Sequence, residues 1–217
     1  MGTLQARHWQ SLLEPGITAI VGAGGKTTVL SKLVEYGGLY GQPVVVTTTT
    51  KLYESQVALW KPYYGHDFNE AEAACREALQ RGRCGAWFSG IDGTKVTALT
   101  GRQIDELNMV HPNWQIVVEA DGAREKWLKA PKSTEPVIPS RTTTTIGVVN
   151  LQVLGTAIDA EHVHNIDEVV EIMEREEGAV VTSTMLAQLV KHPHGLFQYS
   201  AGKKVLFCTG YDTVQHR

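Results

Sequence analysis

The chain has 217 residues, of which 42% are hydrophobic and 20% charged, and its formal net charge is -3. This composition is ordinary for a globular protein, and no basic face points to a nucleic-acid partner. No apolar run approaches the roughly 20 residues that cross a bilayer, and the N-terminal stretch "MGTLQARHWQSLLEPG" lacks the apolar core of a secretion signal. We therefore expect a cytoplasmic protein with no membrane partner.

The first part of the chain predicts a βαβ unit. Ile17 to Val21 is a short apolar run that ends in glycines, which is typical of a buried strand entering a tight turn. Apolar residues at helical spacing follow, and the Gly37-Gly38 pair is expected to end that helix. Pro43 to Val46 is a second β-branched run. Strand, turn, helix and strand in this order favour a parallel sheet.

The middle of the chain predicts a helix, a hairpin and a second helix. The helix covers Phe68 to Gln80, with Asn69 as a candidate N-cap. The stretch "GAWFSGIDGTKVTAL" predicts a hairpin that turns at Asp92-Gly93. A short helix is expected over Arg102 to Met109.

The rest of the chain continues the α/β pattern. "WQIVVEADGARE" (114–125) predicts a strand with an acidic end, and the proline-rich stretch 126–140 predicts a long surface loop. Further strands are expected at 144–150 and 203–208, and helices after the N-cap Asn165 and over 183–190. We expect a single domain over residues 1–217 with a P-loop NTPase-like α/β fold, a mostly parallel sheet and helices on both faces.

The stretch "AIVGAGGKTTVL" (19–30) carries the strongest functional signal. A turn from a strand into a helix aims backbone N–H groups at one point, and glycines allow a phosphate to approach closely. We expect the phosphate-binding residues to be Gly22, Ala23, Gly24, Gly25, Lys26, Thr27 and Thr28. Lys26 supplies the positive charge and Thr27 the hydroxyl for Mg²⁺. The first glycine of the usual Walker A motif would fall at Ile20, which we assign to the strand, so the loop is short.

Two carboxylates end the strand "IVVEAD". Glu119 and Asp121 point to the same side of an extended chain, about 7 Å apart. Beside a phosphate loop this arrangement is expected of a Walker B element. We take Lys26, Glu119 and Asp121 as candidate catalytic residues, with Thr27 and Asp121 as the metal ligands. A strand end that merely turns polar at the surface is the simpler alternative.

Neighbouring polar residues are candidates for substrate binding. Thr48, Thr49 and Lys51 follow the second strand, on the edge where open α/β sheets bind ligands. Arg124 and Lys129 follow the acidic strand and are suited to holding an anion. Capping roles for the threonines, or a solvated basic loop, explain these residues equally well.

The histidines and cysteines suggest no metal site of their own. The pairs at 162 and 164 and at 192 and 194 lack companion ligands, so we interpret them as surface or structural histidines. Cys75, Cys84 and Cys208 form no CxxC pair and are expected to be free and mostly buried.

The motifs "VGAGGKTT", "TTTTK", "EADGAR", "LKAP", "EPVIP", "EHVH" and "HPHGL" occur in an order that resembles the YqeC family from about Ile17 to Asp212. The resemblance implies a P-loop-like fold and an accessory role for selenium-dependent molybdenum hydroxylases, in their maturation or in the supply of their cofactor. A hydroxylase of this kind, or its cofactor, is the expected partner. In the family, the last strand tends to end in an "NKxD"-like motif, as in guanine-specific GTPases. The corresponding segment here is "CTGYD", which keeps only the aspartate, so the sequence does not decide between ATP and GTP.

Three functions remain open from the sequence. The first is a Mg²⁺-dependent accessory protein that binds a nucleotide and hydrolyses it. The second is an ATP-dependent small-molecule ligase or kinase, because the G-x-x-G-K-T-T loop resembles the shortened phosphate loop of the Mur ligases, which bind ATP. The third is a nucleotide-sensing module without catalysis, since no obvious nucleophile is present.

Overall fold

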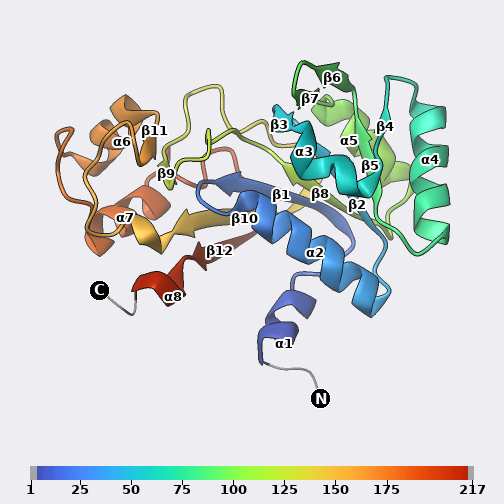
Figure 1. Cartoon of the computed structure of the whole chain (residues 1–217), viewed down its shortest axis with the longest axis horizontal. Coiled ribbons are helices and arrows are strands. Elements are labelled where there is room, and N and C mark those ends of the chain that lie inside the picture. The colour runs from blue at the N-terminus through green and yellow to red at the C-terminus, as the bar shows by residue number, and fades with distance from the viewer. Residues whose placement is uncertain (1–3, 215–217) are drawn as a thin grey trace.

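A seven-stranded sheet forms the centre of the computed structural model, which describes residues 4–214 (Figure 1). The strands lie in the order β12–β10–β1–β8–β2–β5–β4, and each neighbouring pair is parallel. Their bounds are β1 Gly16–Gly22, β2 Val44–Thr48, β4 Tyr63–Tyr64, β5 Gly85–Phe88, β8 Gln115–Glu119, β10 Thr142–Asn150 and β12 Lys203–Thr209. This confirms the expected parallel α/β sheet.

Two small sheets lie beyond the main one. β3 (Leu52–Tyr53), β7 (Lys95–Thr97) and β6 (Gly90–Asp92) form an antiparallel sheet in that order. β9 (Leu128–Lys129) and β11 (Val163–His164) form a parallel pair. The predicted hairpin at Asp92-Gly93 is therefore confirmed, although residues 85–88 of the same stretch belong to the main sheet.

Helices cover both faces of the main sheet, as predicted. Their bounds are α1 Leu4–Gln10, α2 Lys26–Tyr40, α3 Glu54–Val57, α4 Phe68–Gln80, α5 Gly101–Val110, α6 Ile166–Met173, α7 Ser183–Lys191 and α8 Tyr211–Val214, with short 3₁₀ turns at Ala58–Trp60 and Leu151–Val153. Side chains alternate along each strand, so Ile20 and Val117 pack with α2 on one face. Ile17 and Ile116 pack with α4 and α5 on the other face, where Val21 also meets α6 and α7.

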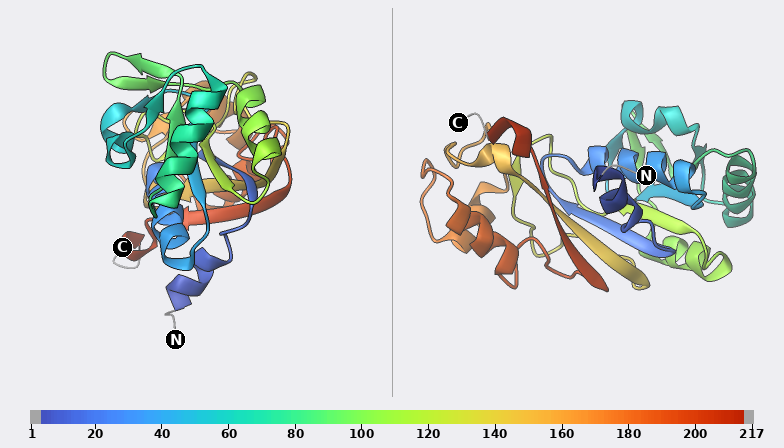
Figure 2. Two further views of the ribbon diagram at one scale, coloured as in Figure 1. Left: turned by 90° about the vertical axis from the view of Figure 1, so that its right-hand side faces the viewer. Right: turned by 90° about the horizontal axis from the view of Figure 1, so that it is seen from below.

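The views in Figure 2 show how these helices are distributed along the twisted sheet. In the view from below, α6 and α7 (orange) lie at one end of the molecule and α4 (green-blue) at the other. The carboxyl ends of the central strands β1, β2 and β8 lie between these groups and carry the loops described below. Among residues 4–214, no helix has both the length and the apolar character of a membrane span.

Two expectations about helix ends were wrong. Helix α2 continues through Gly37 and Gly38 to Tyr40, and its C-cap is Gly41, whose N–H donates to the Gly37 carbonyl. Gly37 is a glycine because a Cβ there would lie 2.4 Å from a methyl group of Val44, so it serves close packing of helix on strand. The N-cap of α4 is Asp67, not Asn69, and its carboxylate accepts from the Glu70 N–H.

The expectation of a surface loop over the proline-rich stretch 126–140 was only partly correct, because most of the stretch is irregular but not all of it lies at the surface. It contains β9, and Leu128, Lys129 and Ala130 are almost completely buried. Asn165 does precede α6, but its side chain makes no capping hydrogen bond and donates instead to the Ala130 carbonyl. Of the cysteines, Cys75 is buried and Cys84 partly buried, whereas Cys208 is exposed.

Candidate functional site

The glycine loop joins β1 directly to α2. Ile20 lies inside β1, as predicted, and the loop starts at Gly22. Gly22, Gly24 and Gly25 all have positive φ, at 95°, 70° and 138°. A Cβ on Gly22 would lie 2.2 Å from the Val148 carbonyl oxygen, and one on Gly24 would lie 2.4 Å from a side-chain atom of Asn150. The loop therefore requires glycine for its backbone conformation and for its packing against β10.

The loop leaves a row of backbone amides without protein partners. The N–H of Gly22 donates to Oδ2 of Asp121 and that of Ala23 to the Val148 carbonyl. The N–H groups of residues 24–28 have no acceptor within the described part of the chain, and the first helical bond runs from Val29 to Gly25. Unpaired amides at the positive end of a helix form a cradle for an anion.

Lys26 lies at the floor of this cradle, 4% exposed, between the loop and the end of β8. Its Nζ is 2.7 Å from the Gly22 carbonyl oxygen, 2.9 Å from Oδ1 of Asp121 and 3.7 Å from Oε1 of Glu119. Burial alone would lower the pKa of this amine, but the two carboxylates outweigh it and raise the pKa above its ordinary value. Lys26 is therefore a buried, firmly charged ammonium group.

The two carboxylates reach Lys26 because β8 is the direct neighbour of β1, with Glu119 in register with Ile20. Burial raises the pKa of the Glu119 carboxyl, and this effect outweighs the opposing attraction of Lys26. Oε2 of Glu119 accepts no hydrogen bond from the described residues, and Oδ1 of Asp121 is satisfied only by its ion pair with Lys26. Buried acceptors without partners are uncommon, and of these two carboxylates Glu119 lines the pocket described next.

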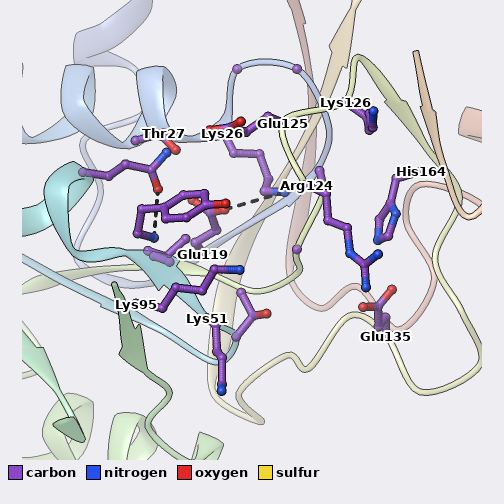
Figure 3. A pocket seen from close by; sticks show the side chains of 18 residues that line it. Lys26, Thr27, Lys51, Lys95, Glu119, Arg124, Glu125, Lys126, Glu135 and His164 are labelled. Carbon is purple, nitrogen blue, oxygen red and sulfur yellow. Dashed lines mark hydrogen bonds and ion pairs between the residues drawn. The ribbon is translucent and has the colours of Figure 1, made fainter. Parts of the chain in front are cut away.

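These groups open into a pocket of about 590 Å³ between the loop, the ends of β2 and β8, and the small strands (Figure 3). Of the predicted site residues, the pocket is lined by Gly24, Gly25, Lys26, Thr27, Lys51, Glu119 and Arg124. It is also lined by residues that the sequence analysis did not select: Thr50, Leu52, Tyr53, Gln56, Lys95, Gly122, Ala123, Glu125, Lys126, Glu135 and His164. A volume of this size is typical of small-molecule sites.

The remaining predicted residues lie behind the pocket wall or beside it. The Thr48 hydroxyl donates to the Glu119 carbonyl and the Thr49 hydroxyl to the Val137 carbonyl, so both are held by backbone groups. Thr28 is exposed on the first turn of α2. Lys129 is 2% exposed, with its Nζ 2.8 Å from Glu135 Oε2 and 3.3 Å from Asp121 Oδ2. These positions give Lys129 a supporting place beneath the site.

Lys51 and Lys95 form one side of the pocket. Lys51 Nζ lies 2.6 Å from Oδ2 of Asp92 on the hairpin, an exposed ion pair. Lys95 lies over the ring of Tyr53, 4.8 Å from its centroid. Figure 3 shows both lysines across the pocket from Arg124 and His164.

His164 reaches the pocket only because β11 pairs with β9, in the register His164 with Lys129. The sequence predicts a surface or structural histidine here, because two-residue strands carry no periodicity from which their pairing could be predicted. His162, two residues earlier, lies 2.7 Å from Asp159 through Nδ1. His192 and His194 lie against each other on the segment after α7.

Carboxylate and hydroxyl oxygens, the donors that Mg²⁺ prefers, occur at this site. Among the described residues, no three His, Cys, Asp or Glu side chains are grouped to hold a metal by themselves. Mg²⁺ commonly takes one or two carboxylates and fills its other positions with water and phosphate oxygens. Thr27 and Glu119, whose Oε2 has no hydrogen-bond partner among the described residues, both line the pocket and fit this pattern. Asp121 does not line the pocket, and its two oxygens already face Lys26, the Gly22 N–H and Lys129.

A parallel α/β sheet, a glycine loop on a central strand and a lysine held by acids of the next strand define a protein with a P-loop NTPase-like arrangement. The chain belongs to the YqeC family, whose sequence model, described as "YqeC protein", matches residues 18–167. It is 31% identical over 184 residues to the uncharacterized protein YqeC of Escherichia coli strain K12, covering 85% of this chain and 71% of that relative. No solved structure matches the chain.

Proposed function

We propose that this protein binds a nucleoside triphosphate with Mg²⁺ and promotes transfer or hydrolysis of its terminal phosphoryl group. The observation that carries the proposal is the position of Lys26, buried between the Gly22 carbonyl and the carboxylates of Asp121 and Glu119. An ammonium group there, under five unpaired amides of residues 24–28, is suited to a polyphosphate.

Each residue has a distinct part in this proposal. The amides of Gly24 and Gly25 and the Lys26 ammonium hold phosphate oxygens. The Thr27 hydroxyl and the Asp121 carboxylate would hold Mg²⁺, which would supply charge neutralisation. Glu119, whose pKa is raised by burial, is suited to share the metal or to accept a proton from the attacking group. ATP and GTP are both compatible with the residues that line the pocket.

Calorimetry tests the binding step. ATP and GTP are titrated into the protein with Mg²⁺ and again in EDTA, and the Lys26→Met variant serves as the control. Binding by the wild type that is lost in the variant supports the proposal. Absence of binding for both nucleotides in the folded wild type disproves it.

The cellular role follows from the family resemblance and is part of the proposal: maturation of selenium-dependent molybdenum hydroxylases or supply of their cofactor. The test is the activity and selenium content of such a hydroxylase, purified from cells that lack this protein and carry either the wild type or Lys26→Met. Equal activity and selenium content with and without the protein would reject this role.

A ligase or kinase acting on a small molecule is favoured by one further observation. The pocket continues past the loop to Arg124, Glu135 and His164, which leaves room for a second substrate. Nucleotide turnover that starts on addition of a small molecule alone supports this function. Turnover that needs the hydroxylase supports the accessory role, and tight binding without any turnover supports a sensor.

A further inference from the structure

The pocket has a cationic end that the nucleotide-binding loop does not use. Arg124 follows the acidic strand, and Figure 3 shows its side chain directed toward His164 and Glu135. No ion pair or hydrogen bond of the Arg124 guanidinium occurs among residues 4–214. Arg124 is exposed, so its guanidinium is accessible to a ligand, and its five N–H donors favour carboxylate and phosphate oxygens.

The backbone that presents Arg124 is strained. The N–H of Lys126 donates to the Ala123 carbonyl, which closes a tight turn with Arg124 and Glu125 at its centre. These two residues have φ values of 47° and 62°, in the left-handed region that normally takes glycine or asparagine. Each costs about 1–2 kcal/mol in this conformation. Strain of this kind is concentrated at ligand-binding positions.

The carboxylate that Figure 3 shows beside Arg124, that of Glu135, is paired with a buried lysine. Oε2 of Glu135 lies 2.8 Å from Nζ of the buried Lys129 and 3.4 Å from the side-chain nitrogen of Asn165. Lys129 is shared with Asp121, which lies 3.3 Å from its Nζ, so Lys129 is fully compensated by the two carboxylates. The positive charge at this end of the pocket therefore comes from Arg124. Lys126 adds to it, although its Nζ is held by the Glu161 carbonyl at 3.2 Å.

His164 lies beside this charge as a neutral donor. Burial lowers its pKa, and the positive charges of Lys129 and Arg124 lower it further. A neutral imidazole donates one hydrogen bond and avoids repulsion from the arginine. The pairing of β11 with β9 fixes its position relative to Lys129.

We propose that Arg124 and His164 form a subsite for a small oxyanion, a carboxylate or a tetrahedral oxyanion, at the end of the pocket opposite Lys51 and Lys95. Arg124 binds two oxygens of the anion in a bidentate contact, and the His164 N–H donates to a third position. That this anion is the second substrate rests on the proposed nucleotide function. The binding of the anion itself does not depend on that function.

The imidazole signals of His164, assigned by comparison with His164→Gln, are followed by NMR against pH. Sulfate and acetate are the two probes, each titrated into the full chain without nucleotide. The expected result is a saturable upward shift of the His164 pKa, because a bound anion favours the imidazolium. A shift with sulfate alone supports a tetrahedral anion, and a shift with acetate alone supports a carboxylate.

Arg124→Ala is compared with Arg102→Ala, an exposed arginine on α5 outside the pocket. We expect Arg124→Ala to lower the affinity for the anion that shifts the His164 pKa by about tenfold or more. We expect Arg102→Ala to leave this affinity unchanged. Equal affinity in both variants means that the anion binds elsewhere and overturns the subsite, as does the absence of any shift. Calorimetry of the wild type with ATP tests nucleotide binding separately. The oxyanion subsite and the nucleotide function can therefore be disproved independently of each other.

Discussion

The Nζ of Lys26 and Oδ1 of Asp121 are 2.9 Å apart, although 95 positions separate the two residues in the chain. The contact joins the first turn of α2 to the segment after β8, across the boundary between two neighbouring parallel strands. Asp121 also accepts from the Gly22 N–H at 3.1 Å. The carboxylate therefore fixes both the start of the glycine loop and the position of the Lys26 ammonium group.

Lys26→Met tests this arrangement most directly. We expect nucleotide affinity to fall by about 100-fold or more, because a buried charge contact to phosphate is lost. We also expect a loss of stability of about 3 kcal/mol, since Glu119 and Asp121 lose a buried counter-ion while Asp121 keeps Lys129. Calorimetry and urea unfolding measure the two effects. A variant as stable as the wild type would contradict the buried ion pair.

Glu119→Gln tests how the burial of the Glu119 carboxyl changes the stability of the protein with pH. The pKa of Glu119 is raised in the folded protein, so the fold holds its proton more tightly than the unfolded chain does. Its contribution to stability is complete below the ordinary value of 4.5 and is lost as pH rises through the raised value. Glutamine does not ionise, so we expect the stability of the variant relative to the wild type to increase with pH across this range.

Urea unfolding at a series of pH values, from below 4.5 to 8, measures that difference. Glu177→Gln, at an exposed position after α6, is the matched control for the loss of one carboxylate at the surface. A relative stability of Glu119→Gln that is flat or falls with pH would show that Lys26 outweighs the effect of burial. In the same variant, we expect nucleotide turnover to fall if turnover is found in the wild type.

The parts of the site that are local in sequence could be predicted. The short loop, the strand that contains Ile20 and the acidic strand end all follow from motif and hydrophobic periodicity within a dozen residues. The position of Asp121 beside the glycine loop followed from the rule that carboxyl ends of adjacent parallel strands share one edge of a sheet, whereas its ion pair with Lys26 was not predicted. That rule holds here because β8 lies directly beside β1.

The parts that depend on distant packing could not be predicted. The Gly37-Gly38 pair has the appearance of a helix end, but Gly37 is needed where α2 packs on Val44. Lys129 sits in a proline-rich stretch typical of a surface loop, and only its contacts with Asp121 and Glu135 explain its burial. His164 joins the pocket through a pair of two-residue strands, which have no sequence signature.

Asp121→Asn distinguishes a metal ligand from a structural carboxylate. The amide keeps an oxygen that can accept from the Gly22 N–H, so we expect the loop to retain its form. Affinity for the nucleotide in Mg²⁺ should fall several times more than affinity in EDTA, because a neutral oxygen is a poorer ligand for Mg²⁺ than a carboxylate. Calorimetry under both conditions measures the ratio. Equal losses would leave Asp121 with a structural role only.

Gly24→Ala and Gly38→Ala form a matched pair of substitutions with opposite expected effects. At Gly24, φ is 70° and a Cβ would lie 2.4 Å from Asn150, so alanine should destabilise the protein by about 2 kcal/mol and abolish nucleotide binding. At Gly38, inside α2, a Cβ meets nothing within 4 Å, so alanine should stabilise the protein by roughly 0.5–1 kcal/mol. Urea unfolding gives both values, and calorimetry checks that Gly38→Ala binds nucleotide as the wild type does. If Gly24→Ala binds nucleotide normally, the loop amides are not the phosphate cradle, whatever Lys26 contributes.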